Sequence, residues 1–206
     1  MKSKQNIKIL LKTVIDCLND NQPCILPTDT YYALSVKASS SIAVKNLFNI
    51  KKRDFKKPVP ILISSLDDIS KYCDTSSKVI QSLSKRFWPG PLTIVLPLLG
   101  GIPQEINNNS GYIGVRVPDH SFTIELINLL GEPITGTSAN ISNIPPTKNI
   151  NEIIDVFRNQ VCTYVDIPCG KETLSSTVIK IDNENGIDIL REGPIGLDEI
   201  YKEVAQ

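Results

Sequence analysis

The sequence predicts an α/β fold in one domain, residues 1–206, with a twisted mixed β-sheet flanked by helices. Segments of helical periodicity alternate with short apolar runs along the whole chain, a pattern typical of helices layered on a sheet. Two late apolar runs, separated by a short Asn-rich turn, should pair as an antiparallel hairpin and make the sheet mixed. No repeat, low-complexity tract or linker divides the chain, and its length suits one large domain.

The first half of the chain predicts three helices and three strands. Apolar residues at three- and four-residue steps indicate a helix over 7–18. Serines 39–41 offer N-caps for a second helix that runs to Ile50. A third helix, 76–87, must end at the turn 88–91, because two prolines and a glycine forbid its continuation. The expected strands are 23–27, 59–63 and 92–96.

The second half continues the alternation of strands and helices. Asp119 can cap a helix that runs to about Leu130, with Gly131 as its stop. The turn 182–186 joins the two strands of the hairpin. The expected strands are 112–117, 134–137, 163–167, 177–181 and 187–190, and the remaining helices are 151–157 and 197–204.

Charge and hydropathy exclude several classes of protein. Lysine plus arginine equals aspartate plus glutamate at 22 each, whereas a protein that coats nucleic acid usually has a basic excess. Lys12 and Asp16 interrupt the apolar stretch near the N-terminus, so a signal peptide is not indicated. No run approaches the roughly 18 apolar residues of a membrane span. We therefore expect a cytoplasmic protein with no membrane partner.

The cysteines predict neither a metal site nor a disulfide framework. The five cysteines form no CxxC pair, and the chain has a single histidine, His120. We expect reduced thiols, each a small buried hydrophobe. The cysteines are Cys17, Cys24, Cys73, Cys162 and Cys169.

Two polar segments stand out as a candidate anion site. Lys51 and Arg53 place two cations where a helical pattern ends, and Ser138 and Asn140 follow an apolar run. Cations supply charge and the small polar groups supply directed hydrogen bonds, so together they can hold a phosphate. The chain contains no P-loop, GxGxxG or HExxH motif. The alternative is a solvated charge run, since residues 51–57 contain five cations.

Other candidate ligands are polar residues at the ends of predicted strands or within an apolar strand. Asp29 sits in a loop that leaves a strand and either lines a ligand crevice or forms a simple turn. Arg116 lies within an apolar strand, so its guanidinium must face solvent, a carboxylate or an anionic ligand. Arg191 has a comparable placement, and Ser176 either caps a strand or donates to a ligand. For His120 we favour capping or loop packing over catalysis.

Six motifs in order, from about residue 7 to 200, are similar to those of the YrdC/TsaC family. An ordered set is far more specific than any one motif. The segments that carry the resemblance are Pro27-Thr28-Asp29-Thr30-Tyr31-Tyr32-Ala33-Leu34, Lys51-Lys52-Arg53, Phe87-Trp88-Pro89-Gly90-Pro91-Leu92-Thr93, Val115-Arg116-Val117-Pro118-Asp119-His120, Thr137-Ser138-Ala139-Asn140-Ile141-Ser142, and the closing pair Ser176-Thr177-Val178-Ile179 and Leu190-Arg191-Glu192-Gly193-Pro194.

The resemblance implies a YrdC-like fold and L-threonylcarbamoyladenylate synthase activity. In that reaction L-threonine and bicarbonate or CO2 form a carbamate, which attacks the α-phosphate of ATP and expels pyrophosphate. The product feeds a threonylcarbamoyl transferase complex that makes the t6A modification at adenosine 37 of tRNA, and weak tRNA binding is a further expectation. Mg2+ would accompany the ATP, with Asp29 as a candidate helper and no metal site in the protein itself.

The resemblance also assigns roles to residues. The resemblance implies that Lys51 and Arg53 are catalytic and that Arg116 binds the carboxylate of threonine. The implied ATP-binding residues are Lys51, Arg53, Ser138, Asn140 and Arg191, and the implied L-threonine-binding residues are Thr28, Arg116 and Ser176.

The chain departs from the family pattern at four positions. Tyr31 and Ala33 replace a valine and a glycine, which predicts a narrower first loop. Asp54 replaces a proline, and Asn143 replaces a glycine, a change that left-handed backbone tolerates. Two other readings compete: a non-catalytic RNA-binding module that uses the same basic concave surface, and carbamoyl-adenylate chemistry of the kind found in hydrogenase maturation.

Overall fold

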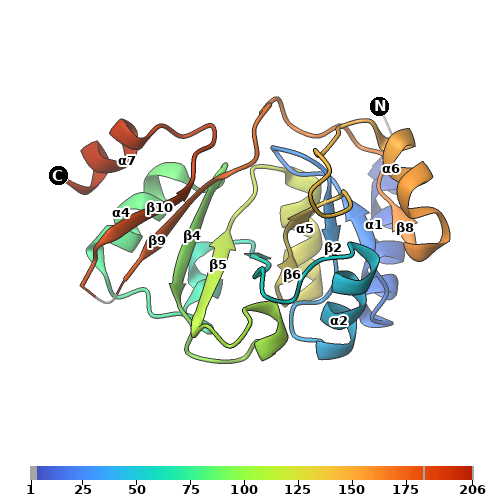
Figure 1. Ribbon diagram of the computed structural model, residues 1–206. Coiled ribbons are helices and arrows are strands. Elements are labelled where there is room, and N and C mark those ends of the chain that lie inside the picture. The colour runs from blue at the N-terminus through green and yellow to red at the C-terminus, as the bar shows by residue number, and fades with distance from the viewer. Residues whose placement is uncertain (1–3, 183, 206) are drawn as a thin grey trace.

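The computed structural model describes residues 4–182 and 184–205, and its helices and strands alternate as the sequence predicts (Figure 1). Asn183, in the predicted hairpin turn, lies outside the described residues. The helices are α1 (Lys4–Asn19), α2 (Ser41–Ile50), α3 (Leu66–Ile69), α4 (Lys78–Phe87), α5 (Ser121–Leu130), α6 (Ile150–Phe157) and α7 (Leu197–Val204), with 3-10 turns η1 (Gln104–Ile106) and η2 (Arg158–Gln160). The strands are β1 (Cys24–Leu26), β2 (Ala33–Ser35), β3 (Ile61–Leu62), β4 (Leu92–Pro97), β5 (Tyr112–Arg116), β6 (Ile134–Thr135), β7 (Thr137–Ser138), β8 (Thr163–Tyr164), β9 (Thr177–Ile181) and β10 (Ile187–Arg191).

The strands form two mixed sheets rather than the single sheet that we expected. One has the order β7-β2-β1-β8 and the other β10-β9-β4-β5-β3-β6. The predicted strand 134–137 divides at Gly136, so β6 pairs with β3 and β7 pairs with β2. A Cβ atom at Gly136 would lie 2.7 Å from the side chain of Leu62, so any larger residue at this crossing between sheets would require Leu62 to move. The sheets stay in contact there, because Thr135 N donates to Val36 O at 2.9 Å.

Two apolar clusters hold the layers together. The larger cluster joins α2 and α4 to the six-stranded sheet, with Phe48 and Leu83 fully buried. The smaller cluster lies between α1, α5 and β1, where Val14 and Leu126 are also fully buried. Burial of such side chains contributes about 1.5–3 kcal/mol each. The apolar faces that predicted the helices are therefore the faces that pack.

Several predicted boundaries are corrected by local hydrogen bonding. His120, not Asp119, occupies the N-cap of α5, and the Asp119 amide instead donates to Asp29 Oδ1 at 3.1 Å. The predicted strand 163–167 ends at Tyr164. From there the chain leaves the sheet as an irregular segment, residues 165–176, which we call the strap. In Figure 1 the strap crosses the top of the molecule from the side of β8 to β9.

The expectation of five reduced thiols is wrong. Cys17 in α1 and Cys162 beside β8 form a disulfide, with Cα atoms 6.3 Å apart. The pairing depends on the packing of α1 against β8, which the spacing of cysteines along the chain does not reveal. Cys24 and Cys73 are free and buried, and Cys169 is free and half-buried. Within the described part of the chain, no helix is long and apolar enough to cross a membrane.

Candidate active site

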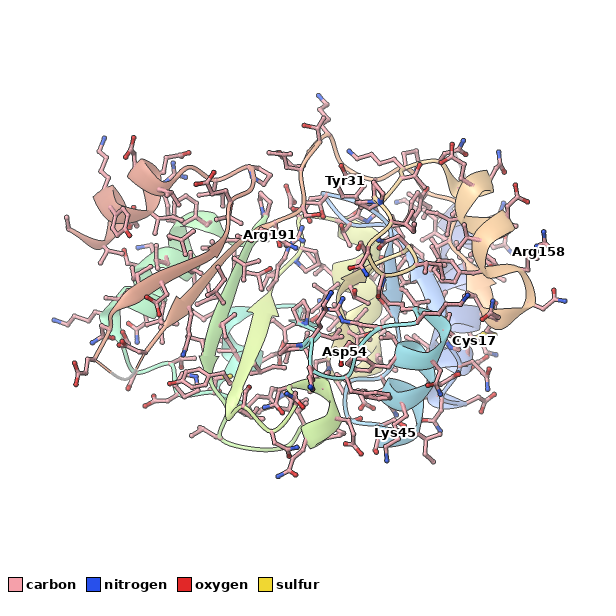
Figure 2. All side chains as sticks on the ribbon, viewed as in Figure 1. Cys17, Tyr31, Lys45, Asp54, Arg158 and Arg191 are labelled. Carbon is pink, nitrogen blue, oxygen red and sulfur yellow. A yellow bond between two sulfur atoms is a disulfide. The ribbon has the colours of Figure 1, made fainter. Side chains whose placement is uncertain are left out.

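A cavity of about 340 Å3 brings together six of the eight residues that the sequence singles out as ligands. It is bounded by loops and strands of both sheets, so the crossing at Gly136 and the strap both help to form it. Figure 2 shows Tyr31 and Arg191, from opposite halves of the molecule, near its centre. The predicted residues in the lining are Thr28, Arg53, Arg116, Ser138, Ser176 and Arg191.

Arg116 is buried and is paired with a carboxylate, one of the three environments expected for a guanidinium in an apolar strand. Its Nη2 forms an ion pair with Asp29 Oδ1, and its Nε donates to Gly90 O at 3.0 Å. Its Nη1 lies 3.3 Å from Thr30 Oγ1. Burial lowers the pKa of Arg116, whereas Asp29 raises it. A guanidinium has five N–H donors, so these three bonds leave donors for a ligand in the cavity.

Arg191 is fixed by Ser176 on the neighbouring strand end. A register shift between Ile189 and Arg191 interrupts the pairing of β10 with β9, and Arg191 pairs with Val178 beyond it. Arg191 Nη2 donates to Ser176 O at 2.8 Å and to Ser176 Oγ at 3.0 Å. Ser176 Oγ also lies 2.8 Å from Thr93 Oγ1. The serine therefore orients the arginine, a role that the sequence did not suggest.

Three arginines give the cavity its charge. Arg53 leaves the C-terminal end of α2 and donates to Lys57 O at 3.0 Å and to Pro58 O at 2.8 Å. Burial and the nearby Arg191 lower the pKa of Arg53, and burial and Arg116 lower that of Arg191. The cavity lining contains no aspartate or glutamate among the described residues. A concave surface with this excess of positive charge attracts anions.

Lys51 and Asn140 lie behind the cavity wall rather than in it. Lys51 is buried, and its Nζ donates to Ser138 O at 2.5 Å and to Asn140 O at 2.7 Å. Ser138 Oγ donates to Asn140 Oδ1 at 2.5 Å. Burial and the nearby Arg53 lower the pKa of Lys51 to about 7. The predicted charge run therefore divides into a buried lysine, a half-buried arginine and exposed lysines.

The loop after β1 is a tight turn held by its own hydroxyl groups. Thr28 Oγ1 donates to Tyr31 O at 2.7 Å and accepts from Thr30 N at 3.1 Å. Asp29 is absent from the cavity lining, and its Oδ1 accepts from Arg116. Outside this loop, Asn143 adopts a φ of 69°, which confirms the left-handed backbone expected where it replaces glycine.

His120 takes no part in the cavity lining. Its Nε2 lies 3.2 Å from Pro168 O in the strap, and burial lowers its pKa. Loop packing, the reading that we favoured for this residue, is confirmed.

Several lining residues were not predicted as ligands. Thr93 belongs to a motif that the sequence had already singled out, and Tyr31 was noted only as a departure from the family pattern. Others lie at ordinary strand or loop positions where no sequence signal marks them. They include Val95, Ser110 and Tyr112, whereas Val178 and Leu190 belong, like Thr93, to segments that carry the family resemblance.

Comparison with known proteins places the chain in a family. A family model of Sua5, YciO and YrdC proteins, described as telomere recombination, matches residues 16–193. The chain belongs to the Sua5/YciO/YrdC family. A family member of Methanocaldococcus jannaschii is 37% identical over 86% of this chain and 83% of its own length. A threonylcarbamoyl-AMP synthase of Wigglesworthia glossinidia brevipalpis is 32% identical over 89% of this chain and 93% of its own length.

Solved structures of Sua5/YciO/YrdC proteins share the fold. P. abyssi Sua5 in complex with L-threonine has a TM-score of 0.89 and 31% identity, and the match covers 98% of this chain but 58% of that protein. The threonylcarbamoyl-AMP synthase of Pyrococcus abyssi likewise extends well beyond the matched region, which spans 53% of its length. E. coli YciO, with a TM-score of 0.84 and 22% identity, shows the fold alone.

Proposed function

We propose that this chain is a threonylcarbamoyl-AMP synthase, a nucleotidyltransferase that forms L-threonylcarbamoyl-AMP and pyrophosphate from L-threonine, bicarbonate or CO2, and ATP. The observation that carries the proposal is the convergence of Arg53, Arg116 and Arg191 on one cavity whose lining has no carboxylate. All the expected substrates but CO2 are anionic or carry a carboxylate, so this charge suits them. Relatives named threonylcarbamoyl-AMP synthase and a neighbour that contains L-threonine support the choice among anionic substrates.

The cavity can be divided between the two larger substrates. Arg53, Ser138 and Arg191 would bind ATP. Thr28 and Arg116 would bind L-threonine, with the remaining N–H donors of Arg116 on its carboxylate. Ser176 would lie at the boundary, because its hydroxyl also accepts from Arg191. We also assign Lys51 and Asn140 to ATP binding. Both would act indirectly, by holding Ser138 in position through hydrogen bonds.

Positioning and charge neutralisation are sufficient for this reaction. The carbamate is itself the nucleophile, so no protein nucleophile is required, and phosphoryl transfer depends on alignment and on neutralised oxygens. Arg53 and Arg191 would neutralise charge that shifts toward the leaving pyrophosphate. Mg2+ would arrive bound to the phosphates of ATP. The lining offers it no carboxylate, and Asp29 is engaged with Arg116, so the protein itself would not hold the ion.

The product would pass to a threonylcarbamoyl transferase complex that modifies tRNA, and direct tRNA contact would be weak given the balanced charge. A cytoplasmic location is part of the proposal. The Cys17–Cys162 disulfide removes one premise of that location, the set of five reduced thiols, since cytosolic disulfides are uncommon.

Pyrophosphate release tests the proposal. Purified protein is given ATP, bicarbonate and either L-threonine, L-serine or no amino acid. We expect threonine-dependent release that falls about 100-fold in Arg53→Ala, the order of effect for loss of one group that stabilises developing charge. Arg86→Ala, whose side chain lies outside the cavity lining, is the matched control and should retain activity. A wild type that binds RNA in a salt-sensitive way but releases no pyrophosphate would support the RNA-binding module instead.

A further inference from the structure

One hydrogen bond joins the middle of the strap to the rest of the described chain. Its first part is fixed where Gly170 N donates to Thr28 O at 2.9 Å and Lys148 Nζ donates to Gly170 O at 2.5 Å. Its last residue is fixed by the bonds of Ser176 to Arg191. Among the hydrogen bonds of residues 171–175, all of which the structure describes, the one contact with the rest of the chain is from Tyr31 Oη to Thr173 O, at 2.5 Å.

Tyr31 also forms part of the cavity itself. It lies in the cavity lining beside Thr28 and Thr30, in the turn whose hydroxyl groups fix its backbone. The ammonium group of Lys148 lies 5.8 Å from the centre of the Tyr31 ring, within the range of a cation–π contact. The turn therefore fixes the backbone of Tyr31, and Lys148 contacts its ring.

These contacts separate two parts of one side chain. The hydroxyl group donates to Thr173 O in the strap, where Thr173 and Leu174 are exposed, and Tyr31 also lines the cavity. A valine at this position, as in the motif that the first loop resembles, has neither an aromatic ring nor a donor. A valine at position 31 would therefore fill less of the cavity and could not bond to Thr173 O.

We propose that Tyr31 is both a positioning and a specificity-determining residue: its hydroxyl group fastens the strap over the cavity, and its ring limits the size of the amino-acid side chain that the cavity accepts. The size limit rests on the proposed function, because Tyr31 lines the cavity together with Thr28 and Arg116, the residues assigned to L-threonine. The fastening of the strap does not depend on any substrate.

Limited proteolysis tests the fastening. Endoproteinase Glu-C can cut after Glu172, next to Thr173, and after Glu184, an exposed residue between β9 and β10. In Tyr31→Phe we expect cleavage at Glu172 to become about five-fold faster, as for the loss of one neutral hydrogen bond. Cleavage at Glu184 should stay unchanged in the same digest. An unchanged rate at Glu172 overturns the fastening.

Calorimetric titration tests the size limit without requiring turnover. L-threonine and the bulkier β-phenylserine are titrated into the wild type, Tyr31→Phe and Tyr31→Val in the presence of a non-hydrolysable ATP analogue. We expect the affinity ratio of phenylserine to threonine to rise at least about ten-fold in Tyr31→Val, within the range set by shape selection in apolar pockets, and to stay unchanged in Tyr31→Phe. An unchanged ratio in Tyr31→Val overturns the size limit. A wild type that does not bind threonine overturns the substrate assignment and the size limit with it, while the Glu172 cleavage still decides the fastening.

Discussion

The ammonium group of Lys51 donates to the main-chain oxygen of Asn140 at 2.7 Å, which joins the end of α2 to the loop after β7. A second bond, to Ser138 O, makes the lysine a link between the two motifs that first suggested an anion site. A buried cation that binds main-chain oxygens shapes a loop as well as supplying charge. The two motifs are therefore one structural unit, of which Ser138 and Arg53 reach the cavity.

Replacement of Lys51 by methionine should change how stability depends on pH. The acceptors around Nζ are uncharged oxygens, so burial and the nearby Arg53 dominate and lower its pKa to about 7. In the unfolded chain the pKa is roughly 10.4, so between about pH 7 and 10 the unfolded state binds more protons and wild-type stability should rise with pH. Urea unfolding at several pH values should show this rise for the wild type relative to Lys51→Met. A difference that does not vary with pH would contradict the prediction.

Loss of the Asp29 carboxylate should destabilise the protein strongly. Removal of one partner leaves the buried Arg116 cation uncompensated, which costs about 3–5 kcal/mol in the free energy of unfolding. Asp29→Ala should show this cost in urea unfolding. Asp29→Asn, which retains an oxygen that can accept from Arg116 and from the Asp119 amide, should lose less. Equal losses in the two variants would show that the hydrogen bonds contribute nothing.

The sequence predicted the order of elements because that order depends on local patterns. Apolar periodicity indicated α1, Gly131 marked the end of α5, and the Trp88–Pro91 turn set the end of α4. Arg116 was also predictable as a residue in need of a partner, since a guanidinium in an apolar strand rarely lies unpaired. In each case the signal comes from neighbours along the chain.

What the sequence missed depends on contacts between distant segments. The break between two sheets arises where Gly136 approaches Leu62, and β2, at three residues, is too short to show a strand pattern. Asp29, the partner of Arg116, is 87 residues away along the chain. Thr173 in the strap is likewise distant in sequence from Tyr31, which donates to it. Six of the eight residues that motif order singled out line one cavity, but motif order could not say that Lys51 and Asn140 lie outside that lining.

The Cys17–Cys162 disulfide should be detectable by thiol titration and should stabilise the folded protein. It lies far from Arg191 in Figure 2, so its effect on the cavity should be small. Thiol titration of the denatured, unreduced protein should find the three free cysteines, Cys24, Cys73 and Cys169, and five thiols after reduction. Cys162→Ser should lower the free energy of unfolding by about 4–5 kcal/mol, because the bond closes a loop across 145 residues. Five thiols before reduction would show that the bond does not form.

Pyrophosphate should stabilise the folded protein through the three cavity arginines. A ligand that binds only the native state at 100 times its dissociation constant adds about 2.7 kcal/mol. Thermal unfolding with increasing pyrophosphate should therefore show a rise in Tm that weakens with added salt. Arg191→Gln should reduce this rise, since it removes a cation from a cavity without a carboxylate, while Arg86→Gln, outside the lining, should leave it unchanged. If both variants respond alike, the anion binds through general surface charge and not in the cavity.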